Sequence, residues 1–144
     1  MFQQDLLKGK RILITGGGTG LGKAMAQRFM GLGATIYICG RRAEILSATE
    51  SELREKTGGP IRAVPCDVRK ADAVDTMIDT IWKEGPLDGL VNNAAGNFLA
   101  RTENLSVGAF EAVIGIVLMG TIHATLACGR RWLSSSALSW SPPP

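Results

Sequence analysis

The sequence has few of the residues that hold metals or disulfide frameworks. It contains one histidine and three cysteines, and no two cysteines form a Cys-x-x-Cys pair. This spacing indicates neither a zinc site nor a disulfide framework, so no metal is expected. We expect Cys39, Cys66 and Cys128 to be small buried hydrophobic residues in a reducing compartment.

A strong charge is also missing. The 144 residues include 16 Lys and Arg and 13 Asp and Glu, for a net charge of +3, and the basic residues are scattered along the chain. A balance this weak is typical of a solvated surface, so no nucleic-acid partner is expected. Residues 1–11 hold no apolar stretch of the kind that a secretory signal needs, which favours a cytoplasmic protein.

One uncharged stretch, residues 112–128, raises the question of a membrane span. It is short for a span of about 20 residues, and it includes Gly115, Gly120 and His123. A buried helix of a soluble fold is the better interpretation, and no membrane span is predicted. His123 has no acid, serine or second ligand placed to work with it, so we expect it to be buried or at an interface rather than catalytic.

Strand-like and helix-like segments alternate along the chain. Such alternation requires a parallel sheet, because each helix returns the chain to the same end of the sheet. Consecutive apolar residues, as in Ile-Leu-Ile and Ile-Tyr-Ile, suit strands that are covered by helices on both faces. The predicted class is therefore α/β, with strands at 11–15, 34–39, 61–65 and 87–91 and helices at 20–30, 42–56, 71–83 and 106–126.

A glycine-rich run, TGGGTGLG, fills the turn between the first predicted strand and the first helix. Gly16 suits the tight turn, Gly20 lets backbone approach a pyrophosphate, and Gly22 lets the helix pack close to the sheet. The helix N-terminus adds free N–H groups and the positive end of its dipole. Because the strand-turn-helix context is the one this motif requires, it predicts a Rossmann-type dinucleotide site formed by Gly16, Gly17, Gly18, Thr19, Gly20, Leu21 and Gly22. The alternative is a glycine-rich loop without a ligand.

The end of the second predicted strand favours NADP(H) as the cofactor. An acid there would bond the ribose 2′-hydroxyl of NAD, but the sequence has Gly40, Arg41 and Arg42, with no acid before Glu44. Arginine forms bidentate, charge-assisted hydrogen bonds to a 2′-phosphate. We therefore expect Arg41 to bind the cofactor, the alternative being that both arginines form an exposed helix start.

Three motifs stand in order: TGGGTGLG, then Cys-Asp-Val at 66–68, then VNNAAG at 91–96. Together they resemble the short-chain dehydrogenase/reductase family over residues 8–133. The resemblance implies a Rossmann fold and hydride transfer with a nicotinamide cofactor. It also implies that Asp67 holds the adenine amino group, that Asn92 and Ala94 line the adenosine side of the cleft, and that Asn93 ties neighbouring strands. Asp67 could instead be a turn residue.

The run NNAAGNF at 92–98, with CDVR before it and IVLMGT after it, is similar to the 2,4-dienoyl-CoA reductase branch of that family. This similarity implies that Arg69, Phe98 and Ser106 contact an acyl-CoA substrate in fatty-acid degradation, and that full-length relatives are homo-oligomers. An arginine suits an anionic CoA thioester. The alternatives are a surface arginine, a core phenylalanine and a serine that caps a helix, and related enoyl-CoA reductases stay open.

The proton-donating Tyr-x-x-x-Lys of this family has no counterpart here. The one tyrosine, Tyr37, lies in a predicted strand, and the last lysine is Lys83, so no catalytic residue is predicted. A complete domain of this type usually has six strands or more. We therefore expect residues 1–133 to be the N-terminal portion of an NADP-binding Rossmann domain, with about four strands and four helices, and residues 134–144 to be an irregular tail.

Two functional hypotheses follow. The chain is either the inactive N-terminal half of an NADPH-dependent reductase of acyl-CoA type, or a truncated, non-catalytic nucleotide-binding or regulatory module. A weaker third idea is a fragment that captures a partner through an unfinished sheet edge and an apolar helix.

Overall fold

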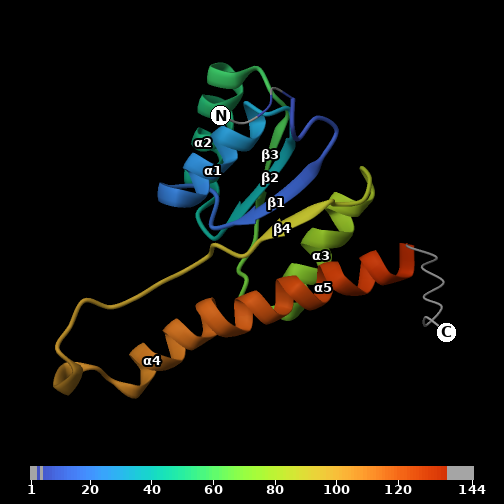
Figure 1. The fold of residues 1–144 in the computed structure, drawn as a ribbon. Helices are drawn as coiled ribbons and strands as arrows, with labels where there is room; N and C mark the ends of the chain where they lie inside the picture. Colours follow the sequence, from blue (N-terminus) through green and yellow to red (C-terminus); the bar gives the residue numbers. More distant parts are fainter. Residues whose placement is uncertain (1–2, 4, 136–144) are drawn as a thin grey trace.

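The computed structural model describes residue 3 and residues 5–135. Four strands form one parallel sheet in the order β3-β2-β1-β4, which confirms the predicted class (Figure 1). The central strand β1 pairs with β2 on one side, Leu13 facing Tyr37, and with β4 on the other, Leu13 facing Leu90. The strand bounds are Arg11–Thr15 for β1, Thr35–Gly40 for β2, Ile61–Pro65 for β3 and Gly89–Val91 for β4.

Helices cover both faces of the sheet, as the consecutive apolar residues of the strands predict. Side chains alternate between the faces along a strand. Accordingly, Leu13 packs under α3 (Ala71–Trp82) and α5 (Gly120–Ser135), whereas Ile14 packs under α1 (Gly20–Met30) and α2 (Ala43–Thr57).

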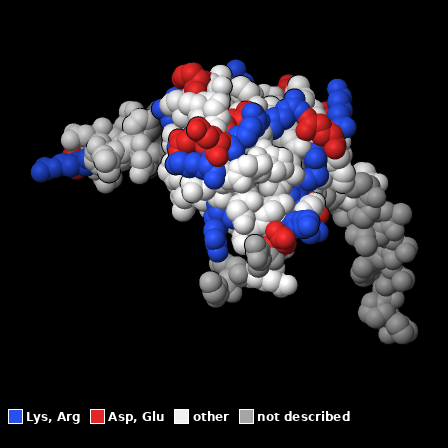
Figure 2. All heavy atoms as spheres, turned by 90° about the horizontal axis from the view of Figure 1, so that it is seen from above, with Lys and Arg blue, Asp and Glu red and all other residues white. Residues whose placement is uncertain are grey.

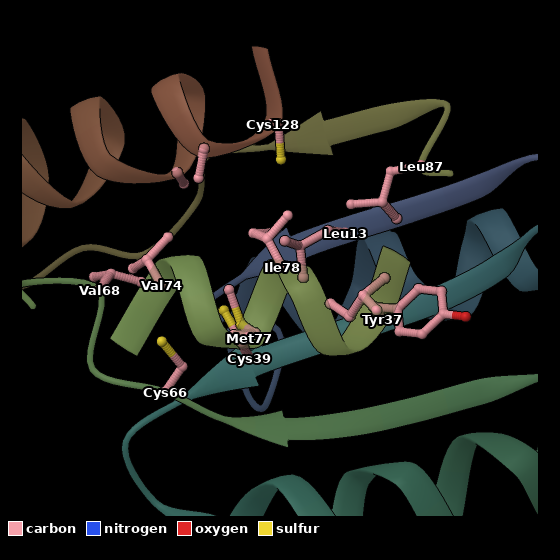
Figure 3. Packing of buried hydrophobic residues seen from close by; sticks show 13 residues of the cluster. Leu13, Tyr37, Cys39, Cys66, Val68, Val74, Met77, Ile78, Leu87 and Cys128 are labelled. Atoms are coloured by element: carbon pink, nitrogen blue, oxygen red, sulfur yellow. The ribbon is translucent and has the colours of Figure 1, made fainter. Parts of the chain in front are cut away.

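The core under α3 and α5 contains all three cysteines (Figure 3). They are buried and unbridged, as expected for small hydrophobic residues. Burial raises the pKa of the Cys39 thiol to about 12 and the pKa values of Cys66 and Cys128 to about 11. The three thiols are therefore uncharged near neutral pH.

The last helix is longer than the prediction of 106–126. It runs without a break through α4 (Val107–Ile114), a π-helical segment (Gly115–Met119) and α5, which ends at Ser135. Tertiary contacts stabilise the additional turns of this helix. Arg131 forms hydrogen-bonded ion pairs with Asp75 and Asp79 of α3, and Nε1 of Trp132 donates a hydrogen bond of 2.5 Å to the Leu87 carbonyl. The first two residues of the predicted tail are thus helical, and the rest of it, residues 136–144, lies outside the described residues.

The other element bounds differ little from the prediction. The fourth strand is shorter than the predicted range 87–91, because Leu87 packs into the core and does not pair with β1. Its side chain is buried, and its carbonyl accepts the bond from Trp132.

Most of residues 97–119, here named the α4 arm, project from the body of the molecule (Figure 1). Many of its apolar side chains are exposed: Phe98, Leu99, Val107, Phe110, Ile114, Val117, Leu118 and Met119. Over the described part of the chain, the joined helix Val107–Ser134 is the one helix long and apolar enough to cross a membrane, with a mean hydropathy of 1.9. This is weak support for a span, because core helices pass the same test. Ala124, Ala127 and Cys128 are buried in the core, but only 22% of the apolar window is buried, so the prediction of a buried helix is wrong for most of this stretch.

Charges of both signs are mixed on the face seen in Figure 2, where Lys and Arg alternate with Asp and Glu. This distribution agrees with the scattered basic residues of the sequence.

Candidate functional site

A cleft of about 350 Å³ lies at the carboxyl ends of the strands. This is where open α/β sheets bind ligands, and the volume is within the range of small-molecule sites. Eight of the predicted cofactor residues line it: Gly16, Gly18, Thr19, Gly20, Leu21, Arg41, Asp67 and Ala94.

The glycine loop has the backbone that its sequence predicts. Gly16 and Gly20 have φ values of +67° and +55°, a left-handed conformation that favours glycine. A Cβ on Gly22 would lie 2.5 Å from the Gly16 carbonyl oxygen and 2.6 Å from Nδ2 of Asn93, so helix α1 approaches the loop as closely as backbone allows. Gly17 and Gly22 are outside the lining and serve packing, Gly17 against Ile38 of β2.

The N-terminus of α1 opens toward this cleft. The N-cap residue Thr19 makes no side-chain capping bond, and the first N–H groups of a helix have no partner within it. The loop is held from behind, because Oγ1 of Thr49 on α2 donates a buried hydrogen bond of 2.7 Å to the Gly18 carbonyl. The cradle therefore has the close backbone and free N–H groups that a pyrophosphate needs.

Thr15 and Asn93 join the ends of β1 and β4. The hydroxyl of Thr15, which is almost fully buried, accepts from the backbone N–H of Asn93 at 3.0 Å and of Ala94 at 2.9 Å. Nδ2 of Asn93 donates to the carbonyls of Thr15 at 3.0 Å and Gly16 at 3.2 Å. Asn93 thus ties neighbouring strands, as the family resemblance implied.

Asn92 points elsewhere. Its Nδ2 donates to Oγ1 of Thr125 on α5 at 3.0 Å, and Asn92 is not among the residues that line the cleft. Asn92 therefore lies outside the cleft lining, although the family resemblance implied that it lines the adenosine side.

The cleft has two basic residues and one acid in its described lining: Arg41, Arg42 and Asp67. Both arginines are exposed, and Arg42 is the N-cap residue of α2. Arg42 is missing from the predicted site, although the signal that pointed to Arg41 covers it equally.

Asp67 is held by Arg69. Nε of Arg69 lies 2.9 Å from Oδ1 and 3.1 Å from Oδ2 of Asp67, and its Nη2 lies 2.6 Å from Oδ2. The backbone N–H of Arg69 donates to Oδ1 as well. These hydrogen bonds hold the pKa of the Asp67 carboxyl below its usual value. Asp67 is a turn residue and a cleft residue at once, whereas Arg69 lies outside the lining.

The other two predicted substrate residues lie on the α4 arm. Phe98 is 54% exposed, so it is not a core residue of the described part of the chain. The Ser106 hydroxyl accepts from the Ala109 N–H at 3.2 Å and so caps α4, as its other interpretation predicts. His123 is half-buried, with Nδ1 2.9 Å from the Val68 carbonyl oxygen, so its Nδ1 is the donor.

Ten further residues line the cleft without having been predicted as ligands. Some follow from general rules, since residues at strand ends and in the first turn of α2 must face this edge. Ile116 could not have been found, because it reaches the cleft from the π-helical segment. The ten are Cys39, Gly40, Arg42, Ile45, Leu46, Cys66, Val68, Asn93, Ala95 and Ile116.

Fold and cleft together define a dinucleotide-binding α/β unit, and comparison with known proteins narrows the class. The short chain dehydrogenase family matches residues 10–137. The probable 2,4-dienoyl-CoA reductase 3 of Caenorhabditis elegans is 45% identical over 137 residues, which are 94% of this chain and 44% of that protein. The probable 2,4-dienoyl-CoA reductase of Bacillus subtilis is 41% identical over 125 residues, 86% of this chain and 49% of that protein.

Solved structures of two dehydrogenases have the same fold as this chain. A citronellol catabolism dehydrogenase of Pseudomonas aeruginosa PAO1 superposes with a TM-score of 0.87 at 33% identity, over 94% of this chain and 56% of that one. A short chain dehydrogenase from Bacillus anthracis gives a TM-score of 0.82 at 44% identity, over 87% of this chain and 52% of that one.

The chain belongs to the short-chain dehydrogenase family of oxidoreductases. It spans about half the length of the relatives that it matches. Membership implies a nicotinamide cofactor, and the glycine cradle fits one.

Proposed function

We propose that this chain is the cofactor-binding half of an NADP(H)-dependent reductase that acts on a 2,4-dienoyl-CoA or a related enoyl-CoA in fatty-acid degradation. The observation that carries the proposal is the pairing of a glycine cradle with Arg41 and Arg42 in one cleft. The glycine cradle would take the pyrophosphate and the arginines the 2′-phosphate.

The preference for NADP(H) rests on charge. No acid stands between the end of β2 and Glu44 to bond a ribose hydroxyl, and two guanidinium groups line the cleft where that hydroxyl would lie. Arginine beside a helix N-terminus is electrostatically unfavourable by itself, so an anionic ligand would compensate the positive charge that gathers there.

The acyl-CoA substrate rests on similarity. Relatives that are 41% to 45% identical carry the name 2,4-dienoyl-CoA reductase. Arg69, Phe98 and Ser106 would contact this substrate. Nη1 of Arg69 makes no hydrogen bond to the described residues, so one edge of the guanidinium is available while the other holds Asp67. The whole protein would be a homo-oligomer. A cytoplasmic location stays a prediction, since relatives of Arabidopsis thaliana and Rattus norvegicus are named peroxisomal.

The second candidate is a nucleotide-binding module without turnover. Tyr37, the one tyrosine in the sequence, is 1% exposed, and its hydroxyl donates to Oε2 of Glu84 at 2.8 Å. It is also absent from the cleft lining, so it cannot protonate a substrate there. We expect the 144-residue chain to reduce no dienoyl-CoA with NADPH, and steady turnover of about 1 s⁻¹ would contradict this.

Titration with NADP⁺ and NAD⁺ tests the proposed cofactor. We expect the double variant Arg41→Ala/Arg42→Ala to raise the Kd for NADP⁺ by about tenfold or more, because charge-assisted hydrogen bonds are lost, and to leave the Kd for NAD⁺ nearly unchanged. Calorimetry or protein fluorescence provides the Kd. Arg101→Ala on the α4 arm is the matched control. Equal losses for both nucleotides, or tighter binding of NAD⁺ by the wild type, would overturn the preference.

A further inference from the structure

The turn after β3 presents Asp67 to the cleft and keeps Arg69 behind it. The Asp67 side chain is 18% exposed and the Arg69 side chain 40% exposed. Arg69 contacts both carboxylate oxygens with its side chain and one of them with its backbone N–H. Four hydrogen bonds from one residue leave the carboxylate little freedom to rotate.

The turn after β3 also packs against the long last helix, residues 107–135. A Cβ on Gly115 would lie 3.6 Å from Cδ of Arg69, so the arginine stem passes directly over this glycine. A Cβ on Gly120 would lie 2.7 Å from Cγ2 of Val68, and Nδ1 of His123 donates to the Val68 carbonyl. The turn after β3 therefore packs against Gly115, Gly120 and His123 of the last helix.

The π-helical segment lies between these two contacts. It begins at Gly115, ends just before Gly120, and contributes Ile116 to the cleft lining. A π-helical turn inside an α-helix is often found at a functional site. Here it places the small residue Gly115 under the stem of Arg69 and Ile116 on the cleft wall.

We propose that Arg69 is a positioning residue: with its stem on Gly115, it fixes the Asp67 carboxylate at the cleft wall so that the carboxylate accepts a hydrogen bond from the nucleotide base. This inference rests on the proposed binding of a nicotinamide nucleotide. Arg69 acts through Asp67, and it links the cofactor cleft to the π-helical segment at the end of the α4 arm.

The charges around Asp67 make the role measurable. Arg69, and more weakly Arg41, lower the pKa of the Asp67 carboxyl. The neighbouring thiols of Cys39 and Cys66 do not ionise in the acid range, because burial raises their pKa values to about 12 and about 11. His123 of α5 is present in every variant below, so it cannot cause a difference between them.

The experiment measures NADP⁺ binding to the full chain and to Arg69→Met, Asp67→Asn and the double variant. Methionine keeps an unbranched stem over Gly115 and removes the guanidinium. We expect Arg69→Met to raise the Kd by about tenfold at pH 7, because an unoriented carboxylate makes a poorer bond to the base. In the Asp67→Asn background, the same change has no further effect, since contacting residues are coupled.

The pH profile adds a readout that a purely structural role would not move. NADP⁺ withstands acid, so its Kd can be followed from about pH 7 to about pH 4, around the ordinary pKa of Asp. Loss of Arg69 raises the pKa of Asp67, so binding to Arg69→Met weakens at a higher pH than binding to the wild type. Arg69→Lys, which keeps the charge without the fork, shows a smaller displacement. Arg101→Met is the control and behaves as the wild type.

The outcomes separate the two proposals. A wild-type chain that binds no NADP⁺ overturns the proposed function and this inference together. A wild-type chain that binds, with an unchanged Kd and pH profile in Arg69→Met, overturns the inference alone. An additive loss in the double variant also overturns it, since Arg69 would then act without Asp67.

Discussion

The sheet with its glycine loop and the α4 arm are built from similar residues but differ in packing. In β2, the residues from Ile36 to Cys39 are at most 1% exposed, because helices cover both faces of the strand. In α4, which is at least as apolar, no residue is buried. The arm leaves the sheet, and no second layer of the described chain lies against most of it (Figure 1).

This difference teaches that apolar content alone does not make a core. A hydrophobic side chain stabilises a fold only when another layer removes it from water. The sheet supplies that layer for α1, α2, α3 and most of α5, but not for α4. Substitutions of the same chemical kind should therefore have unlike effects in the two regions.

The largest expected difference comes from truncating apolar side chains. Ile78 on α3 is fully buried, so Ile78→Ala should lower the free energy of unfolding by about 3 kcal/mol through lost burial and a cavity. Leu99 on the arm is 99% exposed, so Leu99→Ala should change it by less than about 0.5 kcal/mol. Urea unfolding followed by circular dichroism measures both. Equal costs would mean that the arm is packed in solution.

Two glycines provide the next comparison, with effects of opposite sign. Gly22→Ala places a Cβ against the Gly16 carbonyl and Asn93, and the strain should cost about 2 kcal/mol. Gly108 lies in α4 with only Ser106 Oγ near, 3.9 Å from an added Cβ. Gly108→Ala should therefore stabilise the chain by about 0.5 kcal/mol, because alanine favours a helix. Urea unfolding measures the free energy of unfolding of both variants. A loss of stability in both Gly22→Ala and Gly108→Ala would contradict the expected difference.

The smallest effect concerns ion pairs and pH. Glu52 of α2 forms two ion pairs, with Nζ of Lys23 on α1 at 2.5 Å and with Nζ of Lys56 at 2.6 Å. These bonds lower its pKa to about 2, against about 4.3 for an unfolded chain. A lowered carboxyl pKa stabilises the fold above about pH 4.3, and this contribution is lost as the pH falls toward about 2.

Glu52→Gln should therefore make acid unfolding shallower between about pH 4.3 and about pH 2, with the difference reduced by added salt. The control is Glu103→Gln on the arm, where Arg101 lies 3.7 Å away and both side chains are mostly exposed. We expect it to leave the acid-unfolding curve unchanged. A Glu52→Gln curve that coincides with the wild type would show that the α1–α2 ion pair contributes nothing.

The sequence predicts local features of the site well. The glycine turn follows from Gly16 and Gly20, whose φ values few other residues adopt. The order of strands and helices follows from periodicity, since each element is short and has a clear apolar pattern. The contact of Asn93 with Thr15 could not be calculated from the sequence, and only the family resemblance pointed to it.

What the sequence could not provide depends on distant contacts. The Asn92 side chain bonds Thr125, the stem of Arg69 packs over Gly115, and Ile116 reaches the cleft from a π-helical segment. Each of these contacts joins segments far apart in the chain or depends on where the last helix crosses the sheet. The apolar periodicity of the sequence does not predict where the helix crosses, because packing against α3 sets that position.

By itself, the sequence determined an α/β sheet with a dinucleotide cradle, because backbone conformation and strand periodicity are local properties of the residues. The tertiary structure decided which apolar segment is core and which is the exposed arm, and where the last helix ends. It also decided that the Asp67 carboxylate is held by Arg69. Burial and ion pairing depend on what lies opposite a side chain, and only the folded chain brings those partners together.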